Sequence, residues 1–187
     1  APPKKILGKA YLATKCRVRL CTMINQQLKD AINQQVTEEY AAAYTYRHLA
    51  NEMDALSFPG LCAWFTAQAQ EETEHAQKFA KHLIDRGEHV QPRTIAIDAP
   101  EISGPLDAFR AALVHEQKVS EQIREITRIA DEVGDLESRA LLNWFLNEQI
   151  EEEATVGEIV DQLQLVGSDG SGLLRIDAAL STRTTLS

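Results

Sequence analysis

The chain has 187 residues, 44% of them hydrophobic and 25% charged, which suffices for one domain with a sizeable core. No apolar run approaches the roughly 18 residues that a transmembrane helix requires, so we expect no membrane association. The three cysteines, Cys16, Cys21 and Cys62, are too few for a disulfide framework and favour a reducing, cytoplasmic location.

Charge is distributed unevenly along the chain. The net charge is −9, yet residues 1–22 carry six basic side chains and no acidic one. We therefore expect residues 1–22 to form a basic N-terminal extension outside the fold, and residues 23–187 to form the folded domain. A basic tail can also hold nucleic-acid phosphates. We regard this as the lesser alternative and expect no nucleic-acid partner.

Hydrophobic residues recur every three or four positions over four long segments and one short one, which predicts helices. The breaks between them carry helix-ending signals: Pro and Gly within residues 57–60, Gly87, and residues 134–135. Pro105 is favourable at the first position of a helix. The predicted helices cover residues 24–56, 61–86, 105–133, 136–165 and 173–180.

A long connector separates the second and third predicted helices. Residues 88–104 lack helical periodicity and contain Pro92, Pro100 and Gly104. About 17 extended residues can span about 56 Å, whereas a helix of about 28 residues is about 42 Å long, so these two helices can run parallel. We predict an all-α fold: a four-helix bundle with this long crossover and a short C-terminal fifth helix. The fifth helix is too small to be stable alone and must pack on something, such as its copies in other subunits.

Each long helix carries a glutamate where its inward-facing stripe calls for an apolar residue. These stripe positions are Glu39, Glu72, Glu116 and Glu152, with Glu148 as a second one in the fourth helix. His75 lies three residues after Glu72 and so beside it on the same face. The first four glutamates lie about 11 to 16 residues from the starts of their helices and can meet in one layer near mid-height.

Burying an ionised carboxylate costs several kcal/mol unless a cation compensates it. A network of buried salt bridges is one alternative, but no Lys or Arg lies on the stripes except Arg86 at a helix end. Protonated carboxyls are another, and they would need several strongly raised pKa values. A bound metal fits better. Oxygen ligands with one imidazole suit iron or manganese, and a Glu-x-x-His pair facing into a four-helix bundle is typical of di-iron carboxylate sites.

Specific motifs accompany this pattern. They are Glu39, Glu72-Thr73-Glu74-His75, His115-Glu116-Gln117 and Asn147-Glu148-Gln149-Ile150-Glu151-Glu152. With the order of helices and crossover, they make residues 24–182 resemble the ferritins, specifically the bacterial non-haem ferritins. The resemblance implies a shell of 24 subunits in which Fe(II) is oxidised by O₂ or H₂O₂ and stored as a ferric mineral.

The resemblance also implies roles for individual residues. The first iron would be held by Glu39, Glu72 and His75, the second by Glu72, Glu116 and Glu152 with Gln149 nearby, and a third by Glu71, Glu148, Glu151 and Glu152. Tyr46 matches the tyrosine that the family places beside the iron pair, where it could donate an electron or a hydrogen bond. An all-oxygen second site should hold iron loosely, which suits iron as a substrate in transit.

Several alternatives stay open at this point. Haem is not expected, because Thr73 occupies the position of the haem-ligating Met of bacterioferritins. A di-iron oxidoreductase or peroxidase of the rubrerythrin type is the alternative function, disfavoured by the single Glu-x-x-His and the lack of Cys-x-x-Cys pairs. A catalytically silent shell subunit is a third. We expect Trp64 and Trp144 to be packing anchors and His115 to lie at the surface or behind the ligands.

Overall fold

The computed structural model describes residues 23–97 and 99–181, and the prediction for residues 1–22 lies outside this range. The described residues form five helices joined by turns and one long connector, as predicted. They are α1 (Gln26–Ala55), α2 (Pro59–Asp85), α3 (Pro105–Glu132), α4 (Arg139–Val166) and α5 (Gly170–Leu180). No helix within the described residues is long and apolar enough to cross a membrane.

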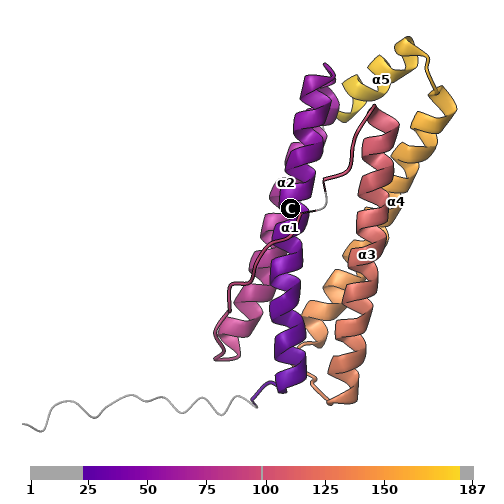
Figure 1. The fold of residues 1–187 in the computed structure, drawn as a ribbon. Helices are drawn as coiled ribbons and strands as arrows, with labels where there is room; N and C mark the ends of the chain where they lie inside the picture. The colour runs from indigo at the N-terminus through magenta and orange to yellow at the C-terminus, as the bar shows by residue number, and fades with distance from the viewer. Residues whose placement is uncertain (1–22, 98, 182–187) are drawn as a thin grey trace, which may run out of the picture.

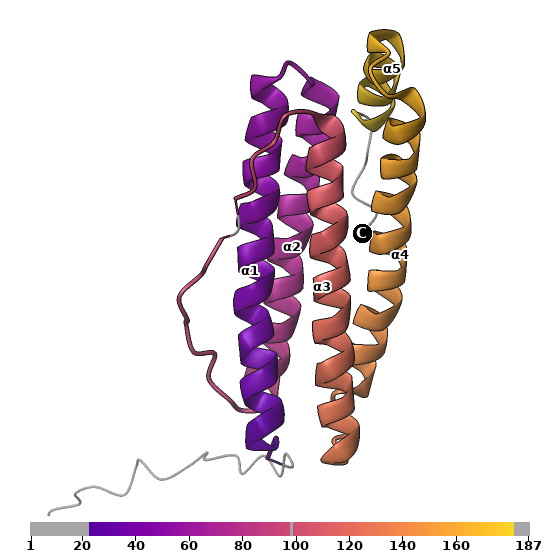
Figure 2. The ribbon, with the colours of Figure 1, turned by 45° about the vertical axis from the view of Figure 1, so that its right-hand side comes forward.

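Two antiparallel hairpins, α1 with α2 and α3 with α4, pack side by side into a four-helix bundle (Figure 1). The connector leaves the lower end of α2, climbs along the outer side of α1 and enters α3 at the upper end (Figure 2). Helices α2 and α3 therefore run in the same direction. This confirms the parallel arrangement that the length of the connector predicted.

Polar side chains of α1 fasten the connector along its path. Lys29 forms an ion pair with Glu88 at 2.6 Å. Asn33 donates to the carbonyl of Gln91 at 3.0 Å and accepts from the amide of Gln91 at 2.7 Å. A side chain that pairs with both backbone groups of one residue replaces the hydrogen bonds that irregular backbone otherwise lacks.

The starts of α4 and α5 differ most from the predicted ones, by three residues each. Helix α4 begins at Arg139, three residues after the predicted start, because Asp135 accepts a hydrogen bond from the amide of Ser138 at 2.9 Å and holds residues 135–138 in a turn. Helix α5 begins at Gly170, before the predicted start at 173. There the carboxylate of Asp169 accepts from two amides of the first turn, which caps the helix.

Helix α5 packs on its own chain, against α2 and α4, at the upper end of the bundle (Figure 1). The carboxylate of Asp177 accepts a hydrogen bond from the amide of Leu61 at 2.9 Å. A Cβ atom at Gly60 would lie 1.8 Å from the carbonyl oxygen of Asp177, so only glycine permits this approach. The contact also supplies a partner for one of the first amides of α2, which a helix cannot satisfy itself.

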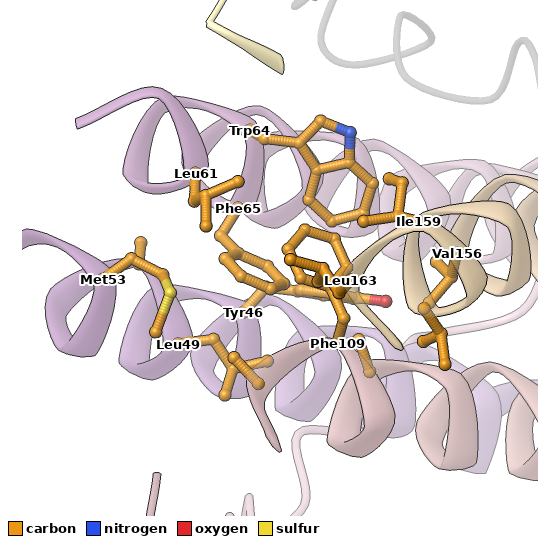
Figure 3. Close-up of a cluster of buried hydrophobic side chains, with 14 of the residues drawn as sticks. Tyr46, Leu49, Met53, Leu61, Trp64, Phe65, Phe109, Val156, Ile159 and Leu163 are labelled. Carbon is orange, nitrogen blue, oxygen red and sulfur yellow. The ribbon is translucent and has the colours of Figure 1, made fainter. Parts of the chain in front are cut away.

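The hydrophobic core is divided into two clusters. The upper cluster gathers side chains from all four long helices, among them Tyr46, Trp64, Phe65 and Phe109 (Figure 3). The lower cluster lies between the N-terminal half of α1, the C-terminal halves of α2 and α3, and the start of α4. Between the two clusters lies a layer of buried polar side chains.

Candidate metal centre

Four glutamates, one from each long helix, are almost completely buried in the layer between the two hydrophobic clusters. Their exposed fractions are 0% for Glu39, 2% for Glu72, 1% for Glu116 and 4% for Glu152, and that of His75 is 2%. The surrounding stripes are apolar above and below, which is why these helices turn the glutamates inward together with their core residues. The burial predicted from the stripes is therefore confirmed.

Glu39, Glu72 and His75 form a compact group. Each offers a ligand atom, and these three atoms lie within 4.8 Å of one another. The Nδ1 atom of His75 lies 3.3 Å from a carboxylate oxygen of Glu72. No hydrogen-bond donor among residues 23–97 and 99–181 reaches Oε2 of Glu39, although this oxygen is buried. A buried carboxylate oxygen left in this way is positioned to accept a cation.

Glu116 is held differently. The hydroxyl of Tyr46 donates to its Oε1 atom, and the amide of Gln149 donates to its Oε2 atom at 3.1 Å. Tyr46 belongs to the upper hydrophobic cluster, so its ring is fixed by packing while its hydroxyl reaches the polar layer. The structure thus brings Tyr46 and Gln149 to Glu116, but does not gather Glu116 into either compact group of ligand atoms.

A second compact group consists of Glu71, Glu148 and Glu152, whose ligand atoms also lie within 4.8 Å of one another. Glu152 is buried, whereas Glu71 and Glu148 are half-buried. Glu148, the second glutamate predicted on the stripe of α4, is therefore less deeply buried than Glu152. Glu151 is exposed and lies outside this group. Glu152 also accepts a hydrogen bond from the amide of Gln68 at 2.8 Å.

Burial shapes the electrostatics of the layer. It raises the pKa values of Glu39 and Glu72 well above their usual range, and the charges of neighbouring carboxylates add to the effect. Burial likewise raises the pKa of Glu116 to about 7, although the donors Tyr46 and Gln149 oppose the shift. Without a cation, the folded chain therefore holds protons here that isolated glutamates would release.

The only buried Lys or Arg among the described residues is Arg86, and it pairs with Asp135 at the lower end of the bundle. The carboxylates of the layer are therefore not compensated by a buried lysine or arginine of this part of the chain. Four carboxylates with one imidazole form a donor set of the kind that suits iron or manganese ions. Both compact groups would hold such an ion by side-chain atoms that are already close together.

Comparison with known proteins agrees with this geometry. A family model described as a ferritin-like domain matches residues 29–166. The chain belongs to the ferritin-like family. It is 35% identical over 162 residues to a bacterial non-heme ferritin of Staphylococcus aureus strain MRSA252, covering 87% of this chain and 98% of that protein. A bacterial non-heme ferritin of Staphylococcus haemolyticus is 33% identical over the same length.

Solved structures agree as well. An open-pore ferritin from the archaeon Archaeoglobus fulgidus superposes with a TM-score of 0.84 at 34% identity, covering 86% of this chain and 99% of that one. The resemblance to ferritins drawn from the motifs is thereby confirmed, as is the fold class of this ferritin-like chain.

The structure refines the predictions for Trp64, Trp144 and His115 in this ferritin-like chain. Trp64 is buried as expected, but Trp144 is 37% exposed and packs edge-on against the ring of His75, with ring centroids 5.5 Å apart. The ammonium of Lys78 lies over the Trp144 ring, 4.3 Å from its centroid. His115 is half-buried, and burial lowers its pKa to about 4.

Gln35 and Gln68 were not among the functional residues predicted from the sequence. Gln35 is 2% exposed and donates to Oε1 of Glu39 at 3.0 Å. Gln68 is completely buried. The available signal was the stripe itself, because an amide on an apolar stripe requires a polar partner in the core.

Proposed function

We propose that this chain is an iron-storage ferritin that oxidises Fe(II) at a di-iron ferroxidase centre within each subunit and stores the ferric product as a mineral inside a shell of 24 subunits. The observation that carries the proposal is the layer of four buried glutamates, one from each long helix, beside one histidine. The matched family and the relatives named bacterial non-heme ferritins support it.

The proposed reaction joins two one-electron donors to one two-electron acceptor. Two Fe(II) ions become two Fe(III) ions, and O₂ takes the two electrons with two protons and leaves as H₂O₂. H₂O₂ can serve as the acceptor instead, and then yields two water molecules with two further protons. Carboxylate oxygens are hard ligands that stabilise Fe(III) over Fe(II), so the layer favours oxidation. Iron is a substrate here and moves on to the mineral.

The residues divide this work between them. Glu39, Glu72 and His75 would hold the first iron, and their close approach supports this assignment. Glu72, Glu116 and Glu152 would hold the second, with Tyr46 and Gln149 positioning Glu116 through their hydrogen bonds. Glu71, Glu148, Glu151 and Glu152 would hold a third iron on its way in or out. The close approach of Glu71, Glu148 and Glu152 supports this assignment, whereas Glu151 lies outside that group.

A second site made only of oxygen ligands should release iron readily. We therefore expect the centre to refill after one oxidation cycle without added reductant. A centre that keeps its first pair of ions permanently would contradict this assignment. It would instead favour the alternative function, a di-iron oxidoreductase or peroxidase of the rubrerythrin type.

Aerobic loading separates the two functions. Purified protein receives many Fe(II) ions per chain and is then passed over a size-exclusion column with iron detection. A storage protein of this kind co-elutes with hundreds of iron ions per particle in a large assembly. Saturation at two or three ions per chain would identify iron as a fixed cofactor and overturn the proposal.

The ligand assignment has its own test. The double variant Glu39→Ala, His75→Ala should lose rapid Fe(II) oxidation, because it removes two of the three ligands of the first iron. Stopped-flow absorption of the ferric product measures the rate. If the double variant oxidised Fe(II) at the wild-type rate, the chain would instead be a catalytically silent shell subunit.

We further propose that residues 1–22 are dispensable, that residues 23–187 form the folded domain, and that the protein works in a reducing cytoplasm without haem. Deletion of residues 1–22 should leave both the size of the assembly and the rate of iron oxidation unchanged. Loss of either would show that this segment belongs to the working protein.

A further inference from the structure

Three buried glutamines surround the carboxylate layer, and each donates a hydrogen bond to one of its glutamates. Gln35 donates to Glu39 at 3.0 Å, Gln68 to Glu152 at 2.8 Å, and Gln149 to Glu116 at 3.1 Å. Their exposed fractions are 2%, 0% and 4%. The resemblance to ferritins drew attention to Gln149 alone. Gln35 and Gln68 have no role in the proposed function so far.

The two unassigned glutamines lie one helical turn before a glutamate of the layer, Gln35 before Glu39 on α1 and Gln68 before Glu72 on α2. The two glutamines differ in which helix carries the glutamate that they bind. Gln35 holds the glutamate of its own helix, whereas Gln68 reaches across the bundle to Glu152 on α4. One glutamine thus serves the group around His75, and the other serves the group around Glu148.

An amide is suited to this position because it is neutral. A lysine or arginine would compensate the carboxylate and remove the need for a metal ion. An amide fixes one carboxylate oxygen and adds no charge, so the group stays attractive to a cation. At Glu39 the consequence is visible: Gln35 holds Oε1, and no donor within the described part of the chain reaches Oε2.

We propose that Gln35 and Gln68 are positioning residues of the metal centre, which hold one oxygen of Glu39 and of Glu152 so that the other oxygen is presented to a metal ion. This inference rests on the proposed function, since it deepens the assignment of the same centre. It also specifies which ion each glutamine affects. Gln35 acts on the ion at Glu39, Glu72 and His75, and Gln68 acts on the ion that Glu152 helps to hold.

The chain supplies matched controls. Gln34 donates to Glu38 at 2.7 Å, and Gln70 donates to Glu74 at 3.4 Å. Both pairs have the four-residue spacing of Gln35 and Glu39, on the same two helices, but lie away from the layer. Gln35→Met and Gln68→Met remove the amide with little change of volume, and Gln34→Met and Gln70→Met remove the same group outside the centre.

The measurement is a calorimetric titration of the metal-free protein with Co(II), which neighbours Fe(II) in the order of divalent-ion affinities and reports binding without oxidation. Partners that orient a metal ligand typically change affinity about 10- to 100-fold when removed. We expect Gln35→Met to weaken the tightest Co(II) site by that factor and Gln68→Met to weaken a later site while sparing the tightest. The two control variants should stay within about twofold of the wild type.

A second pair of variants guards against misfolding. Gln35→Asn and Gln68→Asn keep an amide but shorten the side chain, so the donor no longer reaches, and they should weaken the same sites. Thermal unfolding of every metal-free variant establishes that the bundle is intact. Unchanged Co(II) affinities in folded Gln35 and Gln68 variants overturn the inference. An equal loss in the controls also overturns it, because it shows a general effect on the helices.

The outcomes separate this inference from the proposed function. A wild-type protein that binds Co(II) tightly but neither oxidises nor accumulates iron refutes the proposed function. The Co(II) affinities of the variants would still decide whether the glutamines position the ligands. Conversely, normal iron storage with unchanged Co(II) binding in the Gln35 and Gln68 variants leaves the proposed function standing and refutes the positioning role alone.

Discussion

This bundle buries carboxylates at its lower end and at mid-height, and the two places differ in whether an arginine of the chain itself pairs with them. At the lower end, the guanidinium of Arg86 meets the carboxylate of Asp135 through two hydrogen bonds of 3.1 and 2.8 Å, and each residue is 8% exposed. At mid-height, Glu39, Glu72 and Glu116 are buried to a greater degree, and no lysine or arginine of residues 23–97 and 99–181 is buried beside them.

Their electrostatics differ accordingly. Burial alone would raise the pKa of Asp135, but hydrogen bonds from Arg86 and Ser138 outweigh burial and hold that pKa below its ordinary value. At mid-height, burial and neighbouring carboxylates act together, and the pKa values of Glu39 and Glu72 rise. A charge that the chain compensates itself serves the fold, whereas a charge that it leaves uncompensated is ready for a cation from solution.

The largest effect on stability should come from breaking the compensated pair. Asp135→Ala leaves Arg86 as a buried charge without its carboxylate and also removes the acceptor of the Ser138 amide. Loss of one partner of a buried ion pair costs about 3–5 kcal/mol. Chemical denaturation should show this loss, and the rate of Fe(II) oxidation per folded chain should be unchanged. A cost below about 1 kcal/mol, the range of exposed ion pairs, would show that the pair does not act as a buried one.

The opposite pattern is expected when a charge is removed from the layer. Glu72→Gln keeps the shape of the side chain but removes the carboxylate shared by both proposed iron positions. We expect the rate of Fe(II) oxidation to fall about 100-fold or more. Removing a residue that only orients a metal ligand already lowers activity by up to about 100-fold, and Glu72 is a proposed ligand itself. The metal-free protein should be as stable as the wild type or more stable at neutral pH, because the folded chain no longer has to keep this buried carboxyl protonated or bury its charge. If Glu72→Gln lost both activity and stability, Glu72 would be a residue that stabilises the fold.

The dependence on pH sharpens the contrast further. Burial raises the pKa of Glu116 from its ordinary value of 4.5 to about 7 in the folded chain. The folded metal-free chain therefore binds more protons than the unfolded chain between these values, and its stability should fall as pH rises from 4.5 to 7. Co(II) affinity should change in the opposite sense and rise over the same interval, because ligands must be deprotonated. Asp135 keeps its charge over this interval, so Asp135→Ala should leave both slopes as they are.

The smallest effect on stability is expected at Asp177, a buried carboxylate that accepts a hydrogen bond from a backbone amide. Asp177 is 7% exposed and accepts from the amide of Leu61 at the start of α2. Asp177→Ala should cost about 1 kcal/mol, as the loss of a helix cap does. Denaturant titration measures this cost, and limited proteolysis should show cleavage within α5 earlier than in the wild type. Gly60→Ala, which disturbs the same contact by crowding, should favour the same cleavage, and resistance of both variants would show that α5 is held by other contacts.

Much of this structure could be read from periodicity. Apolar residues at every third or fourth position predicted the helices, and the length of residues 88–104 predicted the direction of α3. Glu39, Glu72 and Glu116 were recognised because they interrupt those apolar stripes. These are properties of single helices, which a sequence displays directly. The turn before α4 was not visible in this way, because it depends on Asp135 accepting from an amide three residues on.

Contacts between helices were harder to predict. The hydrogen bond from Gln68 to Glu152 joins residues 84 positions apart, and no spacing rule relates them. The packing of Trp144 on His75 depends on the rotation of α4 about its axis, which periodicity fixes only to within a residue or so. The apolar stripes predicted that Glu39, Glu72 and Glu116 are buried, and the structure was needed to find which side chains hold them.

The fastening of the connector to α1 has a consequence for how the molecule opens. Gln91 lies in irregular structure, yet its amide is bonded to Asn33, a side chain that is 3% exposed. Amides of irregular segments ordinarily exchange with solvent through small local fluctuations. The Gln91 amide can exchange only when the connector lifts from α1, so its protection from hydrogen exchange reports that separation and distinguishes it from fraying of the helix ends.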